Sequence, residues 1–240
     1  MEGGLVLAHS SFLSVVMRCT HFSNYDYQAI EDLRVLPPLE PKDKAISWAR
    51  GSIRDRDFNE LLITGPRLPV LFSGCRFNSI VFSIRGPGVD EPAHAFEAFL
   101  HKILTHVENA VTNNMEKFKP GLKNAALLQF DRDFIRPSSY GTDLPNEFRV
   151  RLAVKHGGIM ENGEVGDVIE TVFVDENNEP VDPESIRSGA EIIPIFRIAY
   201  FRNTNKFGLN ITLLKGVVYQ SEKRQKLYDY SDLMIDFPAI

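Results

Sequence analysis

One amphipathic segment, residues 90–118, most constrains the fold of this chain, because it predicts a single long helix among strand-like runs. Asp90 can cap this helix, and Pro92 is tolerated in its first turn. Apolar residues recur at the i, i+3, i+4, i+7 spacing of a helix that buries one face: Phe96, Phe99, Leu100, Ile103, Leu104, Val107, Ala110 and Val111. We therefore expect a long helix inserted between strands.

Short β-rich runs lie on both sides of this helix pattern. Residues 68–74 and 78–84 are separated by a turn and predict a pair of strands. Residues 147–157 alternate strictly between apolar and basic positions, which is typical of a strand with one buried face. Residues 169–201 predict two strands joined by an acidic turn, and residues 206–220 predict the last strand. This order indicates a mainly β (α+β) fold, a small barrel or sandwich with an inserted helix.

The same patterns predict three parts in the chain. Residues 1–65 are interpreted as an N-terminal extension that packs on the core. Residues 66–220 form the barrel with its inserted helix, and residues 221–240 form a linker followed by an acidic and hydrophobic tail. At 240 residues the chain is long enough for one large domain with such attachments.

Composition argues against several classes of protein. Cys19 and Cys75 have no metal-binding or redox spacing, which favours a reducing compartment. The N-terminus is a poor signal peptide, and no apolar stretch approaches the roughly 18 residues of a membrane span. We therefore expect a soluble, intracellular protein without a membrane contact.

Charge is segregated along the chain. The net charge of −5 argues against a nucleic-acid partner. However, residues 157–186 hold nine acids and no Lys or Arg. Outside that segment and residues 221–240, 24 Lys and Arg exceed 19 Asp and Glu. This distribution is compatible with a basic surface beside an acidic loop.

No catalytic constellation stands out, and we expect no enzymatic activity, cofactor or metal site. His94, Glu97 and His101 share one helix face, but this face lies opposite the apolar one and is interpreted as a solvated stripe. The nucleophile-elbow, zinc-protease and Cys-x-x-Cys signatures are absent from the sequence. Carboxylates between residues 161 and 184 leave a magnesium-dependent DNA-processing enzyme as a less favoured alternative.

Basic and aromatic residues alternate in three segments of the C-terminal half, which is the composition of a surface for single-stranded nucleic acid. In such a surface, cations follow the phosphates and aromatic rings stack on the bases. The candidate residues are Arg132, Arg136, Tyr140, Arg149, Arg151, Lys155, Arg197, Tyr200, Phe201, Arg202, Lys206 and Phe207. The ordinary alternative is that the basic strand face is only solvated and that half of the aromatic residues form the core.

The order of motifs over residues 145–220 resembles the single-stranded-DNA-binding proteins of the oligonucleotide/oligosaccharide-binding (OB) fold that phages and large DNA viruses encode. The basic alternating strand is followed by an acidic turn from Asp175 to Asp182, and then by a Ser188-Gly189 pair that opens an aromatic, basic strand. The final strand matches a Gly-Leu-x-x-x-Leu-x-x-Val pattern: Gly208, Leu209, Leu213 and Val217.

This resemblance implies a five-stranded OB-like barrel that coats unwound DNA during replication, recombination or repair, with little base preference. Single-stranded DNA, or RNA, would be the partner, and a homodimer would be compatible with exposed strand edges. A viral protein of this kind would act in the host nucleus or in a cytoplasmic replication compartment. The main rival is a virion or scaffold β-protein whose aromatic residues form protein interfaces.

The C-terminal run YDYSDLMIDFPAI, residues 228–240, alternates acids with large apolar groups. One interpretation is an edge strand, because alternation is the ordinary strand signature. The resemblance implies instead a tail that docks replication proteins and competes with DNA for the basic groove. The tail residues assigned to partner binding are Tyr230, Asp232, Leu233, Ile235, Asp236 and Phe237.

Overall fold

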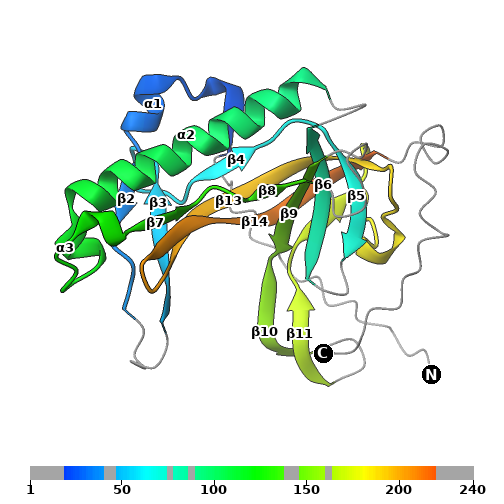
Figure 1. Ribbon diagram of the computed structural model, residues 1–240. Helices are drawn as coiled ribbons and strands as arrows, with labels where there is room; N and C mark the ends of the chain where they lie inside the picture. Colours follow the sequence, from blue (N-terminus) through cyan, green and yellow to red (C-terminus); the bar gives the residue numbers. More distant parts are fainter. Residues whose placement is uncertain are drawn as a thin grey trace, which may run out of the picture.

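The structure is a computed structural model that describes residues 19–40, 47–74, 78–85, 90–137, 146–159 and 164–219. Its main feature is a curved sheet that closes on itself, with one long helix lying across one side (Figure 1).

Five strands form a closed barrel. They are β5 (Leu68–Gly74), β6 (Ser79–Arg85), β9 (Asn146–Leu152), β13 (Glu191–Asn203) and β14 (Lys206–Tyr219). Hydrogen-bonded neighbours run β5–β6–β9–β14–β13, and β13 pairs with β5 to close the ring. Only the β9–β14 pair of this ring is parallel. A five-stranded barrel with strand order 1-2-3-5-4-1 is OB-like, so the predicted fold class is confirmed.

The third barrel strand, β9, follows the alternation of its sequence. Phe148 and Val150 are buried, whereas Arg149 and Arg151 between and after them are exposed. The predicted strand is shorter than expected, because it ends at Leu152. The backbone N–H of Ala153 donates to the carbonyl oxygen of Leu213 on β14 at 3.2 Å and to Thr171 Oγ1 at 2.7 Å.

After this break the chain forms a separate two-stranded antiparallel sheet from β10 (Val154–Ile159) and β11 (Val165–Ile169). Lys155 lies on β10, and it is therefore not on the same strand as Arg149 and Arg151. This corrects the expectation that one continuous strand carries the three cations.

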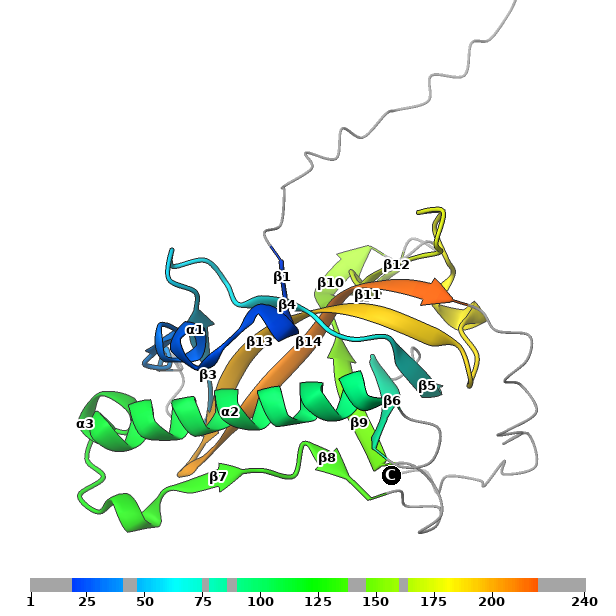
Figure 2. The same cartoon turned by 90° about the horizontal axis from the view of Figure 1, so that it is seen from above.

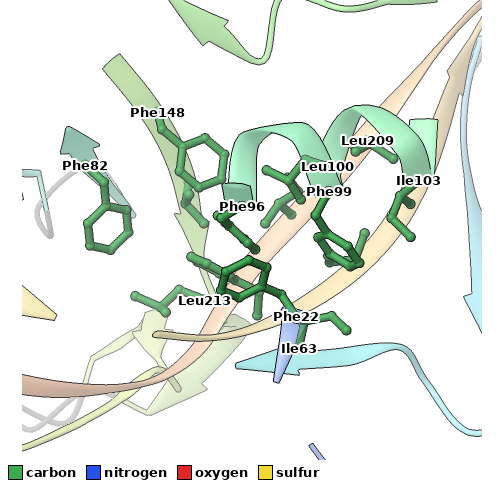
Figure 3. Packing of buried hydrophobic residues seen from close by; sticks show 14 of the residues in the cluster. Phe22, Ile63, Phe82, Phe96, Phe99, Leu100, Ile103, Phe148, Leu209 and Leu213 are labelled. Atoms are coloured by element: carbon green, nitrogen blue, oxygen red, sulfur yellow. The ribbon is translucent and has the colours of Figure 1, made fainter. Parts of the chain in front are cut away.

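The long helix is confirmed as α2 (Glu91–Asn113), followed by the short α3 (Met115–Phe118). Asp90 occupies the N-cap position, but its side chain makes no capping hydrogen bond. The predicted apolar stripe faces the barrel, and Phe96 lies at its centre (Figure 3). Its ring stacks on that of Phe196, with 5.7 Å between the ring centroids, and meets Phe148 edge-on at 6.2 Å.

The face with His94, Glu97 and His101 is less solvated than predicted. Glu97 is buried, because the segment that contains β7 (Gln129–Asp131) and β8 (Ile135–Arg136) runs alongside the helix (Figure 2). Phe134 of this segment packs on the ring of His101, with 4.7 Å between the centroids. Among the described residues, no group of His, Cys, Asp and Glu is arranged to hold a metal ion.

The described part of residues 1–65 adds strands to the same sheet. These elements are β1 (Thr20–His21), the 3-10 turn η1 (Phe22–Asn24), α1 (Tyr27–Glu31), β2 (Arg34–Leu36), β3 (Trp48–Arg54) and β4 (Leu62–Thr64). Both β3 and β4 pair antiparallel with β13. Apolar residues of this segment belong to the main core: Phe22, Ile30, Leu33, Ile53, Leu61 and Ile63.

The remaining elements border the barrel. The 3-10 turn η3 (Ala125–Leu127) precedes β7, and β12 (Val172–Val174) pairs in parallel with β14. The 3-10 turn η4 (Pro183–Ser185) lies between β12 and β13 in the chain. Within the described ranges, no helix has both the length and the apolar character needed to cross a membrane.

Candidate nucleic-acid interface

The strand register creates a broad surface on the side of the sheet opposite α2, which we call the outer face. On β13, Phe196, Ile198 and Tyr200 point toward the helix side and are buried, so Arg197 and Phe201 lie on the opposite side. Figure 1 shows β10, β11 and the beginning of β3 projecting from this side of the barrel. These projections flank the outer face.

Cross-strand pairs set the pattern of this face. Arg151 on β9 pairs with Thr212 on β14, and Thr212 pairs with Arg197 on β13. Further along, Phe201 is paired with Gly208 on one side and with Arg50 of β3 on the other. On the two sides of this pair along β13, Ala199 is paired with Asn210 and Ser52, and Asn203 is paired with Lys206 and Trp48. The centre of the outer face therefore carries small residues, and its margins carry arginines and aromatic rings.

Gly208 fixes the position of the Phe201 ring. A Cβ atom at this glycine would lie 2.7 Å from two carbons of that ring. The ring therefore rests against the backbone of β14, and the Phe201 side chain stays half-buried. Such a ring offers a flat apolar surface beside Arg50 and the floor of the outer face.

A cleft of about 330 Å³ opens between β9 and the β13–β14 hairpin. Trp48, Phe134, Phe201, Arg149 and Arg151 line it, and Trp48 is 41% exposed. A second cleft of about 890 Å³ shares Phe134 and both arginines with the first. The two openings therefore form one continuous groove along the exposed side of β9.

The two arginines of this groove are among the described cations that form no ion pair. In the described part of the chain, no carboxylate forms an ion pair with Arg149 or Arg151. By contrast, Arg132 pairs with Glu108, Lys206 with Asp131 at 3.0 Å and Arg67 with Glu191 at 2.6 Å. Both guanidinium groups are therefore available to an anion, although the carboxylates of Asp131, Asp133 and Glu147 also line the larger cleft.

Three of the predicted interface residues are buried, and the structure contradicts their assignment. Tyr200 and Phe207 are both 0% exposed, and their rings stack on each other with 6.3 Å between the centroids. The Tyr200 hydroxyl donates to the carbonyl oxygen of Leu36 at 2.5 Å. Burial raises the pKa of this phenol, so it remains a hydrogen-bond donor. Neither ring can stack on a base in this conformation.

Arg202 is also structural. Its side chain is 5% exposed and forms two hydrogen bonds with the carboxylate of Glu40, at 2.7 and 2.8 Å. It also donates to the carbonyl oxygen of Phe118 at 3.0 Å. The hydrogen bonds with Arg202 lower the pKa of Glu40. All three corrections have one cause, because inner and outer positions alternate along β13 and β14 and these residues occupy inner ones.

The other predicted residues lie in three settings. Arg136 lines the larger cleft, and Lys155 is exposed on β10. Arg132 and Lys206 are half-exposed and ion-paired, and Arg197 pairs with Glu60 at 3.8 Å. Tyr140 and the tail residues Tyr230, Asp232, Leu233, Ile235, Asp236 and Phe237 lie outside the described residues.

Trp48 and Arg50 are not among the candidates named from the sequence, because residues 1–65 are interpreted there only as an extension that packs on the core. A signal was present, since the run WARGSIR of β3 alternates Trp48, Arg50, Ser52 and Arg54 with smaller or apolar residues. This alternation is the same signature that identified β9.

The fold and this groove define an architectural class, an OB-like barrel with a basic, aromatic outer face. No family model matches the sequence, and no curated protein matches it.

Among solved structures, the chain is similar to gp2.5, a single-stranded DNA binding protein encoded by bacteriophage T7. The identity is 12% and the TM-score 0.45, over 73% of this chain and 98% of that one. It is also similar to the single-stranded DNA-binding protein from bacteriophage Enc34, at 13% identity and a TM-score of 0.39, over 83% and 98% of the two chains. For the complex of the Enc34 protein with single-stranded DNA, the identity is 12% and the TM-score 0.35, over 80% of this chain and 98% of that one. At these identities and TM-scores, the likeness says nothing about what this chain binds.

Proposed function

We propose that this protein binds single-stranded DNA along the outer face of its barrel, with little base preference. The observation that supports this most directly is the groove on β9. There Arg149 and Arg151, which form no ion pair within the described residues, lie beside the accessible rings of Trp48, Phe134 and Phe201. Guanidinium groups neutralise phosphates, and aromatic rings stack on unpaired bases at about 1–3 kcal/mol per base.

The position of the groove on the barrel supports the same proposal. OB barrels bind oligonucleotides on the face of their second and third strands and on the adjoining loops. Here β9 is the third strand, and the turn between β13 and β14, the fourth and fifth strands, follows Asn203 at the edge of the cleft. Stacking on a protein ring requires a base that is not paired in a duplex, so we expect single strands to be preferred.

The sole tryptophan of the chain gives a direct measurement of this binding. Trp48 lines the cleft and is 41% exposed, so a base that stacks in the cleft should quench its fluorescence. We expect oligo-dT to quench the signal in a saturable manner, and less tightly as salt rises. Trp48→Phe, which keeps an aromatic ring, should lose the signal but still shift oligo-dT in a gel.

Reversing the charge of both groove arginines provides the main mutational test. Arg149→Glu together with Arg151→Glu should weaken oligo-dT binding and flatten its salt dependence. Each phosphate contact in a single strand contributes about 0.7 to the log–log slope, so the loss of two contacts should lower the slope by about 1.4. The measurement is fluorescence anisotropy of labelled oligo-dT over a range of salt concentrations.

The matched control is Lys102→Glu with Lys117→Glu, which makes the same charge change at exposed positions on α2 and α3. Its affinity and slope should stay close to those of the wild-type chain. Unchanged affinity and slope in the Arg149 and Arg151 variant would refute the proposed interface.

A gel-shift assay with single-stranded and duplex oligonucleotides, in magnesium and in EDTA, separates the rival functions. A shift of single strands in both conditions supports the proposal, and cleavage in magnesium alone indicates a DNA-processing enzyme. No interaction with either oligonucleotide favours a virion or scaffold protein. Competition with oligo-U tests whether RNA binds the same surface, because stacking and phosphate contacts can hold DNA and RNA alike.

We also infer that the protein coats unwound DNA in replication, recombination or repair, and that residues 228–240 dock a partner protein. The support is the sequence of this segment, in which Asp229, Asp232 and Asp236 alternate with large apolar groups. An acidic segment should compete with DNA for a basic groove. Deletion of residues 228–240 should therefore tighten oligo-dT binding at low salt, as measured by anisotropy; weaker binding or loss of folding would favour the edge-strand alternative.

A further inference from the structure

A second group of cations lies on the outer face, away from the groove on β9. Arg50 and Arg54 alternate on β3, and Arg197 lies on the neighbouring strand β13. A small depression of about 30 Å³ is lined by these three side chains and by Glu60. Arg50 is paired with Phe201, which lines the groove, so the depression lies on the strand next to it.

Among the described residues that line the depression, one carboxylate accompanies the three arginines. It belongs to Glu60 and lies 3.8 Å from Arg197. The nearby Asp55 carboxylate is occupied by the backbone N–H groups of Asp57 and Asn59, at 2.9 and 2.8 Å. Within the described ranges, the three guanidinium groups therefore share the carboxylate of Glu60.

Several features of the group oppose stability. Arg34 of β2 is directly opposite Arg54 in the antiparallel pairing, and like charges in such a pair are destabilising. Burial lowers the pKa of Arg50, and repulsion from Arg197 and Arg54 acts in the same direction, against the attraction of Glu60. The Nε atom of Arg197 is buried without a hydrogen-bond partner. An unfavourable arrangement of this kind is explained if an anion occupies the site.

An exposed aromatic ring lies at the far end of the group. Phe58 is 56% exposed, and the guanidinium of Arg34 lies 4.1 Å from the centre of its ring. Its φ angle is 65°, in the left-handed region that side chains such as Phe rarely adopt. The equivalent turn that begins at Asp175 has Asn178 at this position, also with φ 65°, which is the ordinary choice.

We propose that Arg50, Arg54 and Arg197 form a second phosphate-binding subsite for the same nucleic-acid strand. This inference rests on the proposed function, and it extends the path of the strand from β9 across the small residues of the floor to the tip of the β3–β4 turn. Arg151, Thr212 and Arg197 are in register on three adjacent strands, so the two groups of cations are about 10 Å apart. Guanidinium groups suit phosphodiester oxygens because they donate two parallel hydrogen bonds.

The test compares two double variants that remove the same charge. Arg50→Ala with Arg54→Ala removes part of the second subsite, and Arg149→Ala with Arg151→Ala removes part of the groove. Lys102→Ala with Lys117→Ala is the control. The probe is labelled oligo-dT of about 16 nucleotides, the upper site size of one OB barrel. Binding is followed by anisotropy over a range of salt concentrations, and folding by urea unfolding.

For Arg50→Ala with Arg54→Ala, we expect the affinity to fall about 10-fold at low salt and the salt slope to fall by about 1.4. The urea midpoint should be unchanged or higher, because repulsion is relieved. A folded variant with wild-type affinity and slope would overturn the second subsite. If the Arg50 and Arg54 variant binds like wild-type protein while the Arg149 and Arg151 variant binds more weakly, the proposed function is retained and the second subsite is rejected. If wild-type protein binds no oligo-dT, the proposed function itself fails.

If the Arg50 and Arg54 variant does not fold, a single variant tests the second subsite instead. Glu60→Gln removes the described carboxylate that faces the group and leaves every arginine in place. We expect it to bind oligo-dT several-fold more tightly than wild-type protein, and to show a steeper salt slope. Unchanged or weaker binding would overturn the subsite.

Discussion

Tyr200 shows how the environment of one residue decides whether it supports the fold or contacts a ligand. Its ring covers Gly51 of β3 so closely that a Cβ atom there would lie 1.8 Å from the ring. Its hydroxyl reaches across β3 to the carbonyl oxygen of Leu36 on β2. The neighbouring Phe201 faces the other side of the sheet and lines the cleft. Adjacent aromatic residues therefore have different roles, set by the side of the strand on which each lies.

Tyr200→Phe separates these roles experimentally. Removal of the hydroxyl loses one buried hydrogen bond, so we expect the free energy of unfolding to fall by about 1 kcal/mol. Oligo-dT affinity should not change, because the ring does not reach the outer face. Urea unfolding and anisotropy measure the two quantities. A folded variant with clearly weaker binding would show that Tyr200 takes part in the interface.

At the scale of elements, α2 closes the inner side of the barrel. Phe96 is the residue of this helix that contacts the most aromatic partners, since its ring packs on those of Phe22, Phe99, Phe148 and Phe196. These rings come from the N-terminal segment, the helix and two barrel strands. The helix thereby connects parts of the chain that are far apart in sequence.

Phe96→Ala should destabilise the protein strongly. Truncation of a fully buried Phe removes its apolar contacts and leaves a cavity, at a cost of about 3–5 kcal/mol. Thr112→Ala, at an exposed position of the same helix, should change stability by less than about 0.5 kcal/mol. Urea unfolding of both variants tests this contrast. Similar stability for the two variants would mean that the helix packs more loosely than described.

The sequence predicted those elements whose periodicity is strong. The apolar stripe of residues 90–118 identified α2, and the alternation around Arg149 identified β9. It could not predict the break after Leu152, where the N–H of Ala153 donates to Thr171 Oγ1. Nor could it place Trp48 beside Arg151, because strand register brings together residues that are distant in sequence. The sequence therefore named Arg149, Arg151 and Phe201 of the groove, and Trp48 came only from the structure.

At the scale of the whole molecule, the described part of residues 1–65 shares one core with the barrel. Its strands β3 and β4 cover the edge of β13, and Ile53, Leu61 and Ile63 are buried in the main core. Removal of this segment would expose their partners on β13 and α2 to water. The barrel strands alone therefore lack part of the apolar burial that stabilises them.

A chain that begins at residue 65 and ends at residue 220 tests this dependence. We expect it to lack a cooperative unfolding transition in urea. The edge of β13 and one face of α2 would be exposed to water, and this loss of stabilising free energy exceeds the margin that the remaining contacts provide. The same experiment on residues 19–220 serves as the control and should give a cooperative transition. A cooperative transition for the shorter chain would show that the barrel is an independent domain.

The parallel pairing of β9 with β14 has a consequence for the order of events during translation. β14 pairs with β13, β9, β7 and β12, and it is synthesised after all of them. The barrel cannot close around its aromatic core until residues 206–219 have left the ribosome. Pairing between strands so distant in sequence is intrinsically slow, and the open intermediate exposes apolar surface and unpaired strand edges. Newly made chains should therefore depend on chaperones in the interval between synthesis and barrel closure.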